Sequence, residues 1–399
     1  MIKVLHANDH YELVGGAEKV FFGLLGVLEE RGVENVVVYQ HSTSAPEKAD
    51  RRAYQVPFLG DANVWQHSGT MERYQEILNQ EKPDLIHLHD IGNPKVAEIS
   101  LRFAPTVQGV YNHSFYCPGG QKYLPFRGKI CNKRFGPGCI ASAFLTHCNS
   151  IRPEVLFSSY LRSYRMLKSN RGLTFLVLSE FQAERLLENG CSRNRVKVFA
   201  PFAEVPAVDL TGRNSKGENA LLFTGRVTRQ KGLDLLLKSL EFLTSPYCLI
   251  VDGDGPYLSQ AKKLAQELGI EKQVEFVGWT SGDKHHGYYE KARVVIVPSI
   301  WPEPFGLVGI EAMSCGKPVV AFNVGGIKDW LEDGVTGYLI EPYDIKKMAA
   351  KIDYLLSHPE MAQTLGLEAR KRVTSKFGRE EYARKILEIY HEAIQNFRI

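Results

Sequence analysis

The sequence lacks the features of a membrane-spanning, secreted or nucleic-acid-binding protein. No apolar run approaches the length that crosses a bilayer, and the opening residues, MIKVLHANDH, hold no cationic leader followed by a long apolar segment. RNA-binding and zinc-finger motifs are absent. The net charge of +4 is too mild to demand a polyanionic partner. We therefore expect a cytoplasmic protein that binds no nucleic acid.

Two further absences narrow the chemistry. No G-x-G-x-x-G follows the first predicted strand, which argues against a dehydrogenase. No cluster of aspartates suggests a magnesium site, so we expect neither a metal nor a cofactor at the active site. The cysteine count is seven, and an odd number fits a reducing compartment better than a disulfide framework.

Four of these cysteines crowd into one segment, at Cys117, Cys131, Cys139 and Cys148. Their spacing, C-x13-C-x7-C-x8-C, lacks the close C-x2-C pairs of ordinary zinc sites. Free, partly buried thiols are the favoured interpretation. A structural zinc and disulfides remain as alternatives.

What the chain does have is a regular alternation of strands and helices. At 399 residues it exceeds what one hydrophobic core usually organises, so two domains are expected. Buried strands are predicted at 2–7 and 84–89, and apolar residues at helical spacing predict a helix over 17–32. This alternation predicts α/β domains whose parallel sheets are covered by helices on both faces.

The alternation weakens near residue 204, where VPAVDLTGRNSKGEN has the composition of a linker, and then restarts. We predict an N-terminal domain at 1–203 and a C-terminal domain at 204–378, both Rossmann-like and doubly wound. An amphipathic helix within 379–399 is expected to pack back on the N-terminal domain. Parallel sheets bind ligands outside the carboxyl ends of their strands, so the ligand is expected in a central cleft between the domains.

The stretch SIWPEPFGLVGIEAMSCGKPVVAF, residues 299–322, carries two acids eight positions apart, Glu303 and Glu311. Pro302 and Pro304 flank the first acid, which excludes a regular helix there and predicts a stiff, extended loop. An ordinary solvated loop acid is the alternative interpretation.

A helix is predicted to follow this loop and to end at Gly316. Its first turn, up to Gly309, should offer unpaired N–H groups and the positive end of the helix dipole to phosphate oxygens. The expected anion-binding amides are those of Gly306, Leu307 and Val308. Glu311, one turn further in, would repel phosphate, so we expect it to bind a neutral diol such as ribose.

Cations should converge on the same place. The segment TGRVTRQKG, residues 224–232, follows a buried strand and supplies Arg226 and Lys231. Two such charges would stabilise a diphosphate leaving group without metal, each charge-assisted hydrogen bond contributing about 1.5–3 kcal/mol. Gly15 and Gly16 precede a helix in the corresponding position of the first domain. Surface cations and a simple strand-to-helix turn are the alternatives.

These motifs, GRVTRQKG and PSIWPEPFGLVGIEAMSCGKPVVAFNVGGIKDWLEDGVTGYLI, resemble the donor domain of family 4 retaining glycosyltransferases, whose glutamates are spaced E-x7-E. The N-terminal half matches more loosely, through the Gly15-Gly16 loop, PDLIHLHD and the NHS tripeptide at 112–114. The resemblance covers nearly the whole chain. It implies a GT-B fold, with a nucleotide-sugar held mostly by the C-terminal domain and the acceptor bound by the N-terminal one.

The resemblance also implies residue roles. In such enzymes the residues matching Arg226 and Lys231 contact the diphosphate, and the one matching Glu311 binds ribose. The residue matching Glu303 contacts the hydroxyls of the transferred sugar. Glycine amides matching Gly16 approach the phosphates.

One histidine completes this implied site. The histidine matching His113 lies near the sugar at the reaction centre, although a histidine in NHSFY could also simply bond a loop. His6, His87 and His89, on or beside strands, are interpreted as satisfied packing residues rather than as ligands.

The implied function is retaining, metal-independent hexosyl transfer. The donor would be a nucleotide-diphosphate sugar of UDP or GDP type, and the acceptor a glycan, a lipid-linked sugar or a polysaccharide. The family's favoured mechanism is front-face attack, in which the leaving diphosphate accepts the acceptor's proton. A non-catalytic nucleotide-sugar-binding protein and a GT-B phosphorylase or epimerase are the alternatives. The presence of both Glu303 and His113 favours an enzyme.

The segment between Lys122 and Arg171 is rich in lysine, arginine, tyrosine and phenylalanine. It fits either a solvated basic helix or an acceptor-domain surface that touches anionic lipid or polysaccharide. The second interpretation predicts peripheral contact with the inner face of the membrane.

Overall fold

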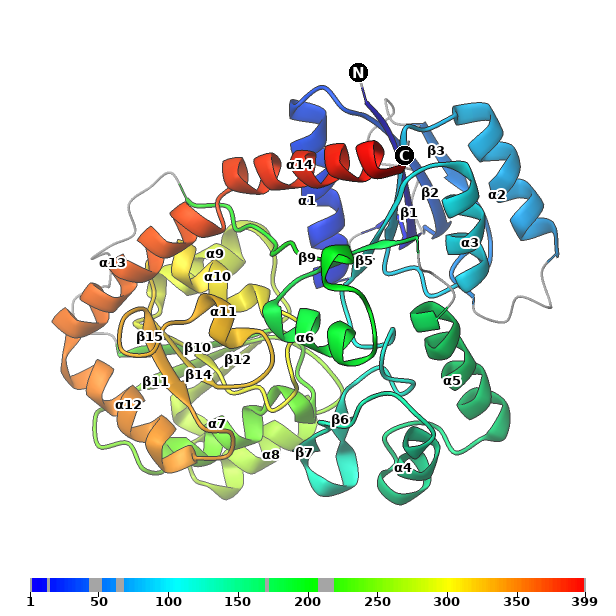
Figure 1. Ribbon diagram of the computed structural model, residues 1–399. Coiled ribbons are helices and arrows are strands. Elements are labelled where there is room, and N and C mark those ends of the chain that lie inside the picture. Colours follow the sequence, from blue (N-terminus) through cyan, green and yellow to red (C-terminus); the bar gives the residue numbers. More distant parts are fainter. Residues whose placement is uncertain are drawn as a thin grey trace. The chain divides into compact units, whose positions relative to one another are not determined.

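The computed structural model describes residues 2–12, 15–42, 52–61, 68–168, 172–206 and 219–397. The chain divides into two compact units (Figure 1). Unit 1 comprises Met1–Pro201 with Glu380–Ile399, and unit 2 comprises Phe202–Arg379. These bounds lie close to the domain boundaries predicted at 203/204 and 378/379. Most of the predicted linker, residues 207–218, lies outside the described residues.

Unit 1 is built on a seven-stranded sheet in the order β3-β2-β1-β4-β5-β8-β9, in which every neighbouring pair is parallel. The strands are β1 (Lys3–His10), β2 (Glu34–His41), β3 (Arg52–Gln55), β4 (Leu85–His89), β5 (Thr106–Val110), β8 (Thr174–Val177) and β9 (Val196–Val198). Strand β1 runs three residues past the predicted end at residue 7, because Asn8 and His10 stay in register with β2. The strand order reverses between β1 and β4.

The helices of unit 1 are, in chain order, α1 (Gly16–Glu30), α2 (Ser68–Glu81), α3 (Pro94–Phe103), α4 (Gly138–Thr146), α5 (Pro153–Lys168), α6 (Glu180–Glu188) and α14 (Arg379–Phe397). A small antiparallel hairpin, β6 (Tyr123–Leu124) and β7 (Lys129–Ile130), encloses the turn η2 (Pro125–Arg127), and a second turn, η3 (Arg193–Arg195), precedes β9. Helix α14 packs on the unit 1 sheet: the Tyr390 hydroxyl lies 2.7 Å from Nδ1 of His87, and the Tyr382 ring stacks 4.3 Å from Phe199.

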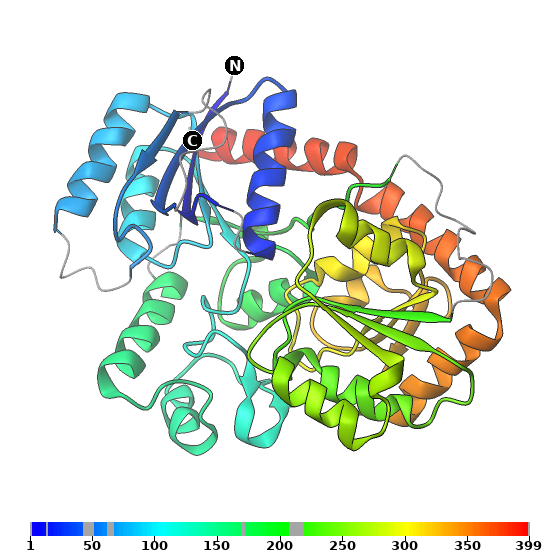
Figure 2. The ribbon, with the colours of Figure 1, turned by 180° about the vertical axis from the view of Figure 1, so that it is seen from behind.

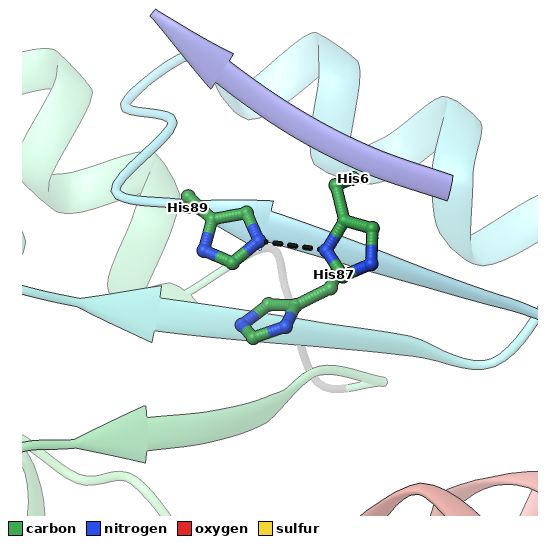
Figure 3. Close-up of side chains that lie close together, drawn as sticks. All are labelled: His6, His87 and His89. Atoms are coloured by element: carbon green, nitrogen blue, oxygen red, sulfur yellow. Dashed lines mark hydrogen bonds between the residues drawn. The ribbon is translucent and has the colours of Figure 1, made fainter. Parts of the chain in front are cut away.

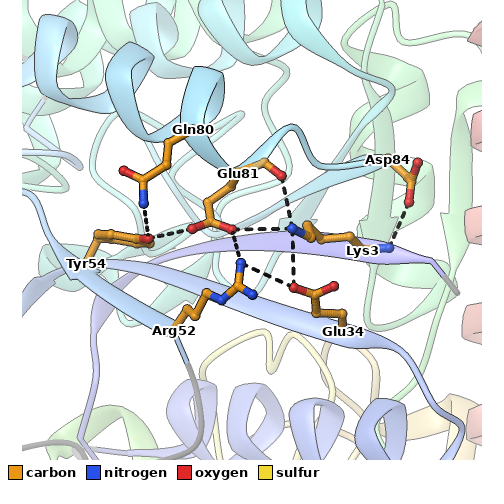
Figure 4. Close-up of polar contacts among 7 residues, drawn as sticks. All are labelled: Lys3, Glu34, Arg52, Tyr54, Gln80, Glu81 and Asp84. Atoms are coloured by element: carbon orange, nitrogen blue, oxygen red, sulfur yellow. Dashed lines mark hydrogen bonds and ion pairs between the residues drawn. The ribbon is translucent and has the colours of Figure 1, made fainter.

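A polar network around Glu81 joins the amino-terminal ends of the unit 1 strands (Figure 4). Glu81, the last residue of α2, is 3% exposed. It accepts hydrogen bonds from Arg52 at 3.0 Å and from the Tyr54 hydroxyl at 2.5 Å, and it pairs with Lys3 at 3.5 Å. Burial acts to raise the pKa of Glu81, but the bonds from Tyr54 and Arg52 outweigh it, so the pKa is lowered. The network lies opposite the carboxyl ends of the strands, which indicates a stabilising role.

Unit 2 holds a six-stranded, all-parallel sheet in the order β12-β11-β10-β13-β14-β15. The strands are β10 (Ala220–Thr224), β11 (Cys248–Asp252), β12 (Val274–Gly278), β13 (Val294–Val297), β14 (Val319–Phe322) and β15 (Gly337–Ile340). Counted within the unit, this is the order 3-2-1-4-5-6 of a dinucleotide-binding sheet, which reverses between β10 and β13. The prediction of two Rossmann-like α/β units is confirmed.

The helices of unit 2 are α7 (Leu233–Leu240), α8 (Leu258–Glu267), α9 (Gly282–Lys291), α10 (Leu307–Ser314), α11 (Ile327–Trp330), α12 (Ile345–Ser357) and α13 (Pro359–Lys376), with the turns η4 (Arg229–Lys231) and η5 (Glu271–Gln273). In Figure 2 the green helices α7 and α8 lie on one side of the sheet and the yellow helices α9 and α10 on the other. Strand β13 ends at Val297. Beyond it, the amide of Ile300 donates to the carbonyl oxygen of Gln230, in the loop after β10, at 2.9 Å.

Candidate functional site

A lysine and a glutamate meet where the strand order of unit 2 reverses. Nζ of Lys231, from the loop after β10, lies 2.6 Å from Oε1 of Glu303, from the loop after β13. The side chain of Glu303 is 6% exposed, whereas that of Lys231 is 31% exposed. The pair therefore presents a cation to solvent and fixes a buried carboxylate behind it.

Besides its two prolines, the Glu303 loop is held by backbone contacts with the loop that follows β14. The amide of Gly326, in the loop after β14, donates to the carbonyl oxygen of Glu303 at 2.8 Å. Gly325 has φ +57°, and a Cβ atom there would lie 2.3 Å from the same carbonyl oxygen. A glycine is needed at that position, because two backbone segments approach each other too closely for any side chain.

Lys231 is placed by a similar close approach. It ends the turn η4, and the next residue, Gly232, has φ +72°. A Cβ atom on Gly232 would lie 1.9 Å from the carbonyl oxygen of Pro298, just past β13. Lys231 also lies 5.3 Å from the centre of the Trp301 ring, within cation–π distance. Arg226 is exposed on the same loop, after Gly225, which has φ +125°.

Helix α10 (Leu307–Ser314) follows the Glu303 loop directly in the chain. The helix is capped by Gly306, which has φ +99°, and begins at Leu307. The amide of Gly309 donates to the carbonyl oxygen of Gly306 at 3.0 Å, so the expectation of unpaired amides throughout the turn is wrong for that residue. A Cβ atom on Gly309 would lie 2.1 Å from the Trp330 ring, which explains the glycine. Leu307 and Val308 carry the remaining amides of the first turn, for which a helix offers no acceptor.

Glu311 belongs to a charged network that the sequence did not predict. Its Oε2 accepts from the Tyr289 hydroxyl at 3.2 Å and lies 3.8 Å from Nε2 of His285. Nδ1 of His285 lies 2.6 Å from Oδ2 of Asp252. The hydrogen bond to Asp252, and then the nearby carboxylate of Glu311, raise the pKa of His285 to about 9. At neutral pH an imidazolium therefore stands between two carboxylates.

Asp252 anchors this network to the sheet. It is the last residue of β11 and is 2% exposed. Its Oδ1 accepts from the amide and the hydroxyl of Thr280 at 3.1 and 2.8 Å. The sequence carried one weak signal for this carboxylate, its position at the end of a buried strand. It carried none for His285, whose helix, α9, is polar on nearly all sides.

In unit 1, Gly15 and Gly16 lie at the start of helix α1, which follows β1. Gly15 is the N-cap and Gly16 the first helical residue. The backbone of Gly15 is extended, with φ −169°, a conformation that any residue can adopt. The placement fits the predicted turn, and a role in phosphate binding stays a prediction.

His113 follows β5 and is fully buried within unit 1. Its Nδ1 lies 2.6 Å from the Tyr116 hydroxyl, and its ring meets that of Phe181 edge-on at 6.1 Å. Just before it, Asn112 donates to Asp90 at the carboxyl end of β4. Burial raises the pKa of Asp90 to about 7. These contacts define how the NHS loop is held, and the catalytic role of His113 stays a prediction.

None of the seven cysteines forms a disulfide, which argues against the disulfide alternative. That the four clustered cysteines are free thiols rather than zinc ligands stays a prediction. The four clustered ones are each partly buried, and burial raises the pKa of Cys139 and Cys148. Within the described ranges, three or more of these sulfur atoms do not come close enough together to share one metal ion.

Two family models match the chain, and together they span most of it. The model described as Glycosyltransferase Family 4 matches residues 14–204, and the model described as Glycosyl transferases group 1 matches residues 211–372. The chain belongs to the family 4 type of glycosyltransferases. The family suggested by the E-x7-E resemblance is confirmed.

Similar proteins agree with this family. The glycosyltransferase is 31% identical over 180 residues to an uncharacterised glycosyltransferase of Methanocaldococcus jannaschii, covering 45% of this chain and 46% of that one. It is 35% identical over 195 residues to the D-inositol 3-phosphate glycosyltransferase of Mycobacterium sp. strain JLS, covering 46% of this chain and 44% of that one. The matched stretch thus spans about half the length of these relatives.

Among solved structures, Anabaena HepE in complex with UDP resembles the glycosyltransferase with a TM-score of 0.74 at 18% identity, covering 98% of this chain and 100% of that one. At this identity the likeness concerns the fold, and it supports the GT-B architecture.

Proposed function

We propose that this glycosyltransferase moves a hexose from a nucleotide-diphosphate sugar, of UDP or GDP type, to a glycan, lipid-linked or polysaccharide acceptor. The reaction retains the anomeric configuration and uses no divalent metal at the diphosphate. The observation that carries the proposal is the ion pair of Lys231 and Glu303 at the switch point of the unit 2 sheet. HepE, the neighbour named above, has structures with UDP and with UDP-glucose, which supports a nucleotide-sugar donor.

The diphosphate is assigned to the cations and amides around this pair. An ammonium group has three N–H donors, and Lys231 uses one of them on Glu303, which leaves donors for phosphate oxygens. Arg226 is exposed on the same loop. The amides of Leu307 and Val308 add the positive end of the α10 dipole. Each charge-assisted bond contributes about 1.5–3 kcal/mol, which supports stabilisation of the leaving group without a metal.

The transferred sugar is assigned to Glu303. A carboxylate has two oxygens, and Lys231 holds one of them. The second can accept from sugar hydroxyls. Because the group is buried, such hydrogen bonds are stronger than they would be in water. The proline and glycine bracing of its loop supports a fixed orientation for the hexose.

The ribose is assigned to Glu311, with His285 as its positioning residue. The imidazolium of His285 is anchored by the buried Asp252 and faces Glu311, so it fixes where that carboxylate points. Tyr289 holds the same carboxylate from a second direction. An orientation fixed from two sides suits the recognition of a neutral diol.

The retaining mechanism is supported by the engagement of both acids. A glycosidase uses one carboxyl group as an acid and another as a nucleophile. Here Glu303 is paired with Lys231, and Glu311 is bonded to Tyr289 and faces His285. This supports a reaction in which the leaving diphosphate accepts the acceptor's proton. Catalysis then consists of positioning and of stabilising the developing phosphate charge.

The acceptor is assigned to a membrane surface through an exposed apolar face of unit 1, which we call the α4–α5 surface. We define this surface by the exposed large apolar side chains of η2, α4, α5 and the segment between the two helices: Phe126, Phe144, Leu145, Ile151, Val155, Phe157, Leu161 and Tyr164. The same stretch of sequence carries exposed cations: Arg127, Lys129, Lys133, Arg134, Arg152 and Lys168. Within the described ranges, the helices include none that is both long and apolar enough to cross a bilayer.

This mixture of side chains is typical of an interfacial contact. Apolar groups enter the headgroup boundary, and each nearby cation contributes about 1 kcal/mol against anionic lipid. The α4–α5 surface therefore supports peripheral binding at the inner face of a membrane, where lipid-linked acceptors lie.

The proposal is tested with a panel of UDP, GDP and ADP sugars and with assays run with and without Mg²⁺ or Mn²⁺. We expect slow donor hydrolysis for one nucleotide class, unchanged by the metal, and an NMR spectrum of the transfer product that retains the anomeric configuration. Binding without any turnover would favour a nucleotide-sugar-binding protein. Pyridoxal phosphate absorbance would favour a phosphorylase.

A further inference from the structure

Three histidines gather in the core of unit 1 (Figure 3). His6 lies on β1 and is paired in register with His87 on β4. His89 lies two residues further along β4, so its side chain faces the same side of the sheet as that of His87. All three are at most 1% exposed. This is the central strand pair of unit 1, where its sheet order reverses.

One ring nitrogen of each histidine lies within 4.8 Å of the other two. A zinc–nitrogen bond is about 2.0–2.1 Å long, so two ligands of one ion lie about 3–4 Å apart. The trio therefore needs only small side-chain adjustments to enclose an ion. Nε2 of His87 is buried and has no hydrogen-bond partner, which is unfavourable for a polar atom taken out of water.

Each histidine is also held from outside the trio by its other ring nitrogen. The outer contacts are His6 Nε2 to Asn35 Oδ1 at 3.0 Å, His87 Nδ1 to the Tyr390 hydroxyl at 2.7 Å, and His89 Nδ1 to the Tyr111 hydroxyl at 2.7 Å. Metal-binding histidines almost always have such a partner, which orients the ring and fixes the tautomer. The three partners come from β2, from α14 and from the segment after β5.

A hydrogen-bonded network without metal explains only part of this arrangement. Nδ1 of His6 lies 3.0 Å from Nε2 of His89. Because Asn35 offers an oxygen, His6 carries its proton on Nε2, and His89 donates from Nε2 to His6. That network involves His6 and His89 but leaves Nε2 of His87 unsatisfied.

We propose that His6, His87 and His89 bind one divalent ion of the zinc class, which ties β1 to β4. A set of imidazole nitrogens suits zinc, and a water would complete the tetrahedron. On binding, His89 changes tautomer: its proton moves from Nε2 to Nδ1 and stays there, and the Nδ1–H group donates a hydrogen bond to the Tyr111 hydroxyl oxygen. Burial lowers the pKa of His87 and of His89 far below the ordinary value, and the neutral imidazole is the form that binds metal. The site is structural and lies in a different unit from Lys231, so it is independent of the proposed function.

Metal analysis of the full chain, purified without chelator, tests the proposal. We expect about one zinc per chain in the wild type, retained in Cys131→Ser and in the exposed control His391→Asn, and lost in His87→Asn. Wild-type protein without metal would contradict the proposal. Zinc that survives in His87→Asn and is lost in Cys131→Ser would assign the metal to the cysteines instead.

A second measurement covers the case in which His87→Asn does not fold. Bound metal is first removed from the wild-type protein by unfolding it in denaturant in the presence of a chelator. The protein is then refolded and titrated with Co²⁺, followed by Zn²⁺. We expect visible absorbance typical of tetrahedral cobalt that zinc displaces, and a higher melting temperature with either ion. A melting temperature unchanged by both ions would overturn the proposal.

Discussion

Nε2 of His285 lies 3.8 Å from Oε2 of Glu311, while the opposite nitrogen of the same ring is held 2.6 Å from the buried Asp252. The two contacts connect the carboxyl end of β11 to helix α10 through one imidazolium. His285 thus sets the electrostatics of the acid assigned to ribose.

Donor affinity should therefore depend on pH through His285. Its pKa is raised to about 9, so the charge that faces Glu311 is present below that pH and is lost as the pH rises through it. We expect the donor Kd to rise several-fold between pH 8 and pH 10. His285→Gln should abolish this rise of the Kd at alkaline pH, whereas His286→Gln, which changes the exposed neighbouring residue, should keep it. The same rise of the Kd in His285→Gln as in the wild type would refute the positioning role of His285.

Neutralising Glu303 and neutralising Glu311 should affect different steps, turnover in the first case and nucleotide binding in the second. Glu303→Gln removes the group assigned to the sugar, so turnover should fall by about a hundredfold, as for one transition-state contact, with the Kd of the free nucleotide unchanged. Glu311→Gln should instead weaken nucleotide binding about tenfold, the loss of about 1.4 kcal/mol of hydrogen bonding. Calorimetry with UDP and GDP, combined with kcat, separates the two outcomes. If Glu303→Gln weakened nucleotide binding and Glu311→Gln lowered turnover, Glu303 would be assigned to the ribose and Glu311 to the sugar.

The central strands β4, β10, β13 and β14 were predictable because each is a short, mostly apolar run. The edge strands β3, with the sequence RAYQ, and β9, with VKV, carry no such run. Glu303 and Lys231 were predictable as separate site residues, since both follow buried parallel strands. Their direct pairing was not, because it depends on the close approach of Gly232 to Pro298 and of Gly325 to Glu303. Such approaches join segments that are distant in sequence, and a single sequence contains no record of them.

Two histidines show what the sequence could not predict. His285 was not predicted as a site residue, and His113 was predicted but its burial was not. His285 sits on a polar helix whose rotation decides whether it meets Asp252, and local periodicity does not fix that rotation. His113 was selected through a family motif, and the structure adds that its ring is fully buried beside Tyr116. Motifs locate a residue along the chain, whereas burial depends on how the surrounding elements pack.

The α4–α5 surface should bind vesicles that contain anionic lipid. Phe144→Ser with Leu145→Ser removes two side chains that are 56% and 72% exposed. We expect this variant to lose most of its sedimentation with phosphatidylglycerol vesicles, while wild-type binding weakens as salt rises. Phe242→Ser, which removes a similarly exposed side chain from unit 2, is the matched control. Equal binding by the double variant and the wild type would exclude this surface.

The Glu81 network should make unit 1 sensitive to acid. The pKa of Glu81 is lowered in the folded state, so its stabilising contribution is present above its ordinary pKa and is lost as the pH falls through the folded value. Glu81→Gln should lower the free energy of unfolding at pH 7 by about 1–3 kcal/mol, because Arg52 and Tyr54 lose a charged acceptor. Urea unfolding at pH 7 and pH 4 measures this, and the difference between variant and wild type should shrink at the lower pH.

The most direct test of the central claim is kcat for Lys231→Ala at saturating donor, beside Lys263→Ala, which removes an exposed lysine of α8, with circular dichroism to verify folding. Loss of one donor to the leaving diphosphate should reduce turnover by at least about a hundredfold, while Lys263→Ala retains wild-type turnover. A folded Lys231→Ala enzyme with near-normal turnover would contradict the account.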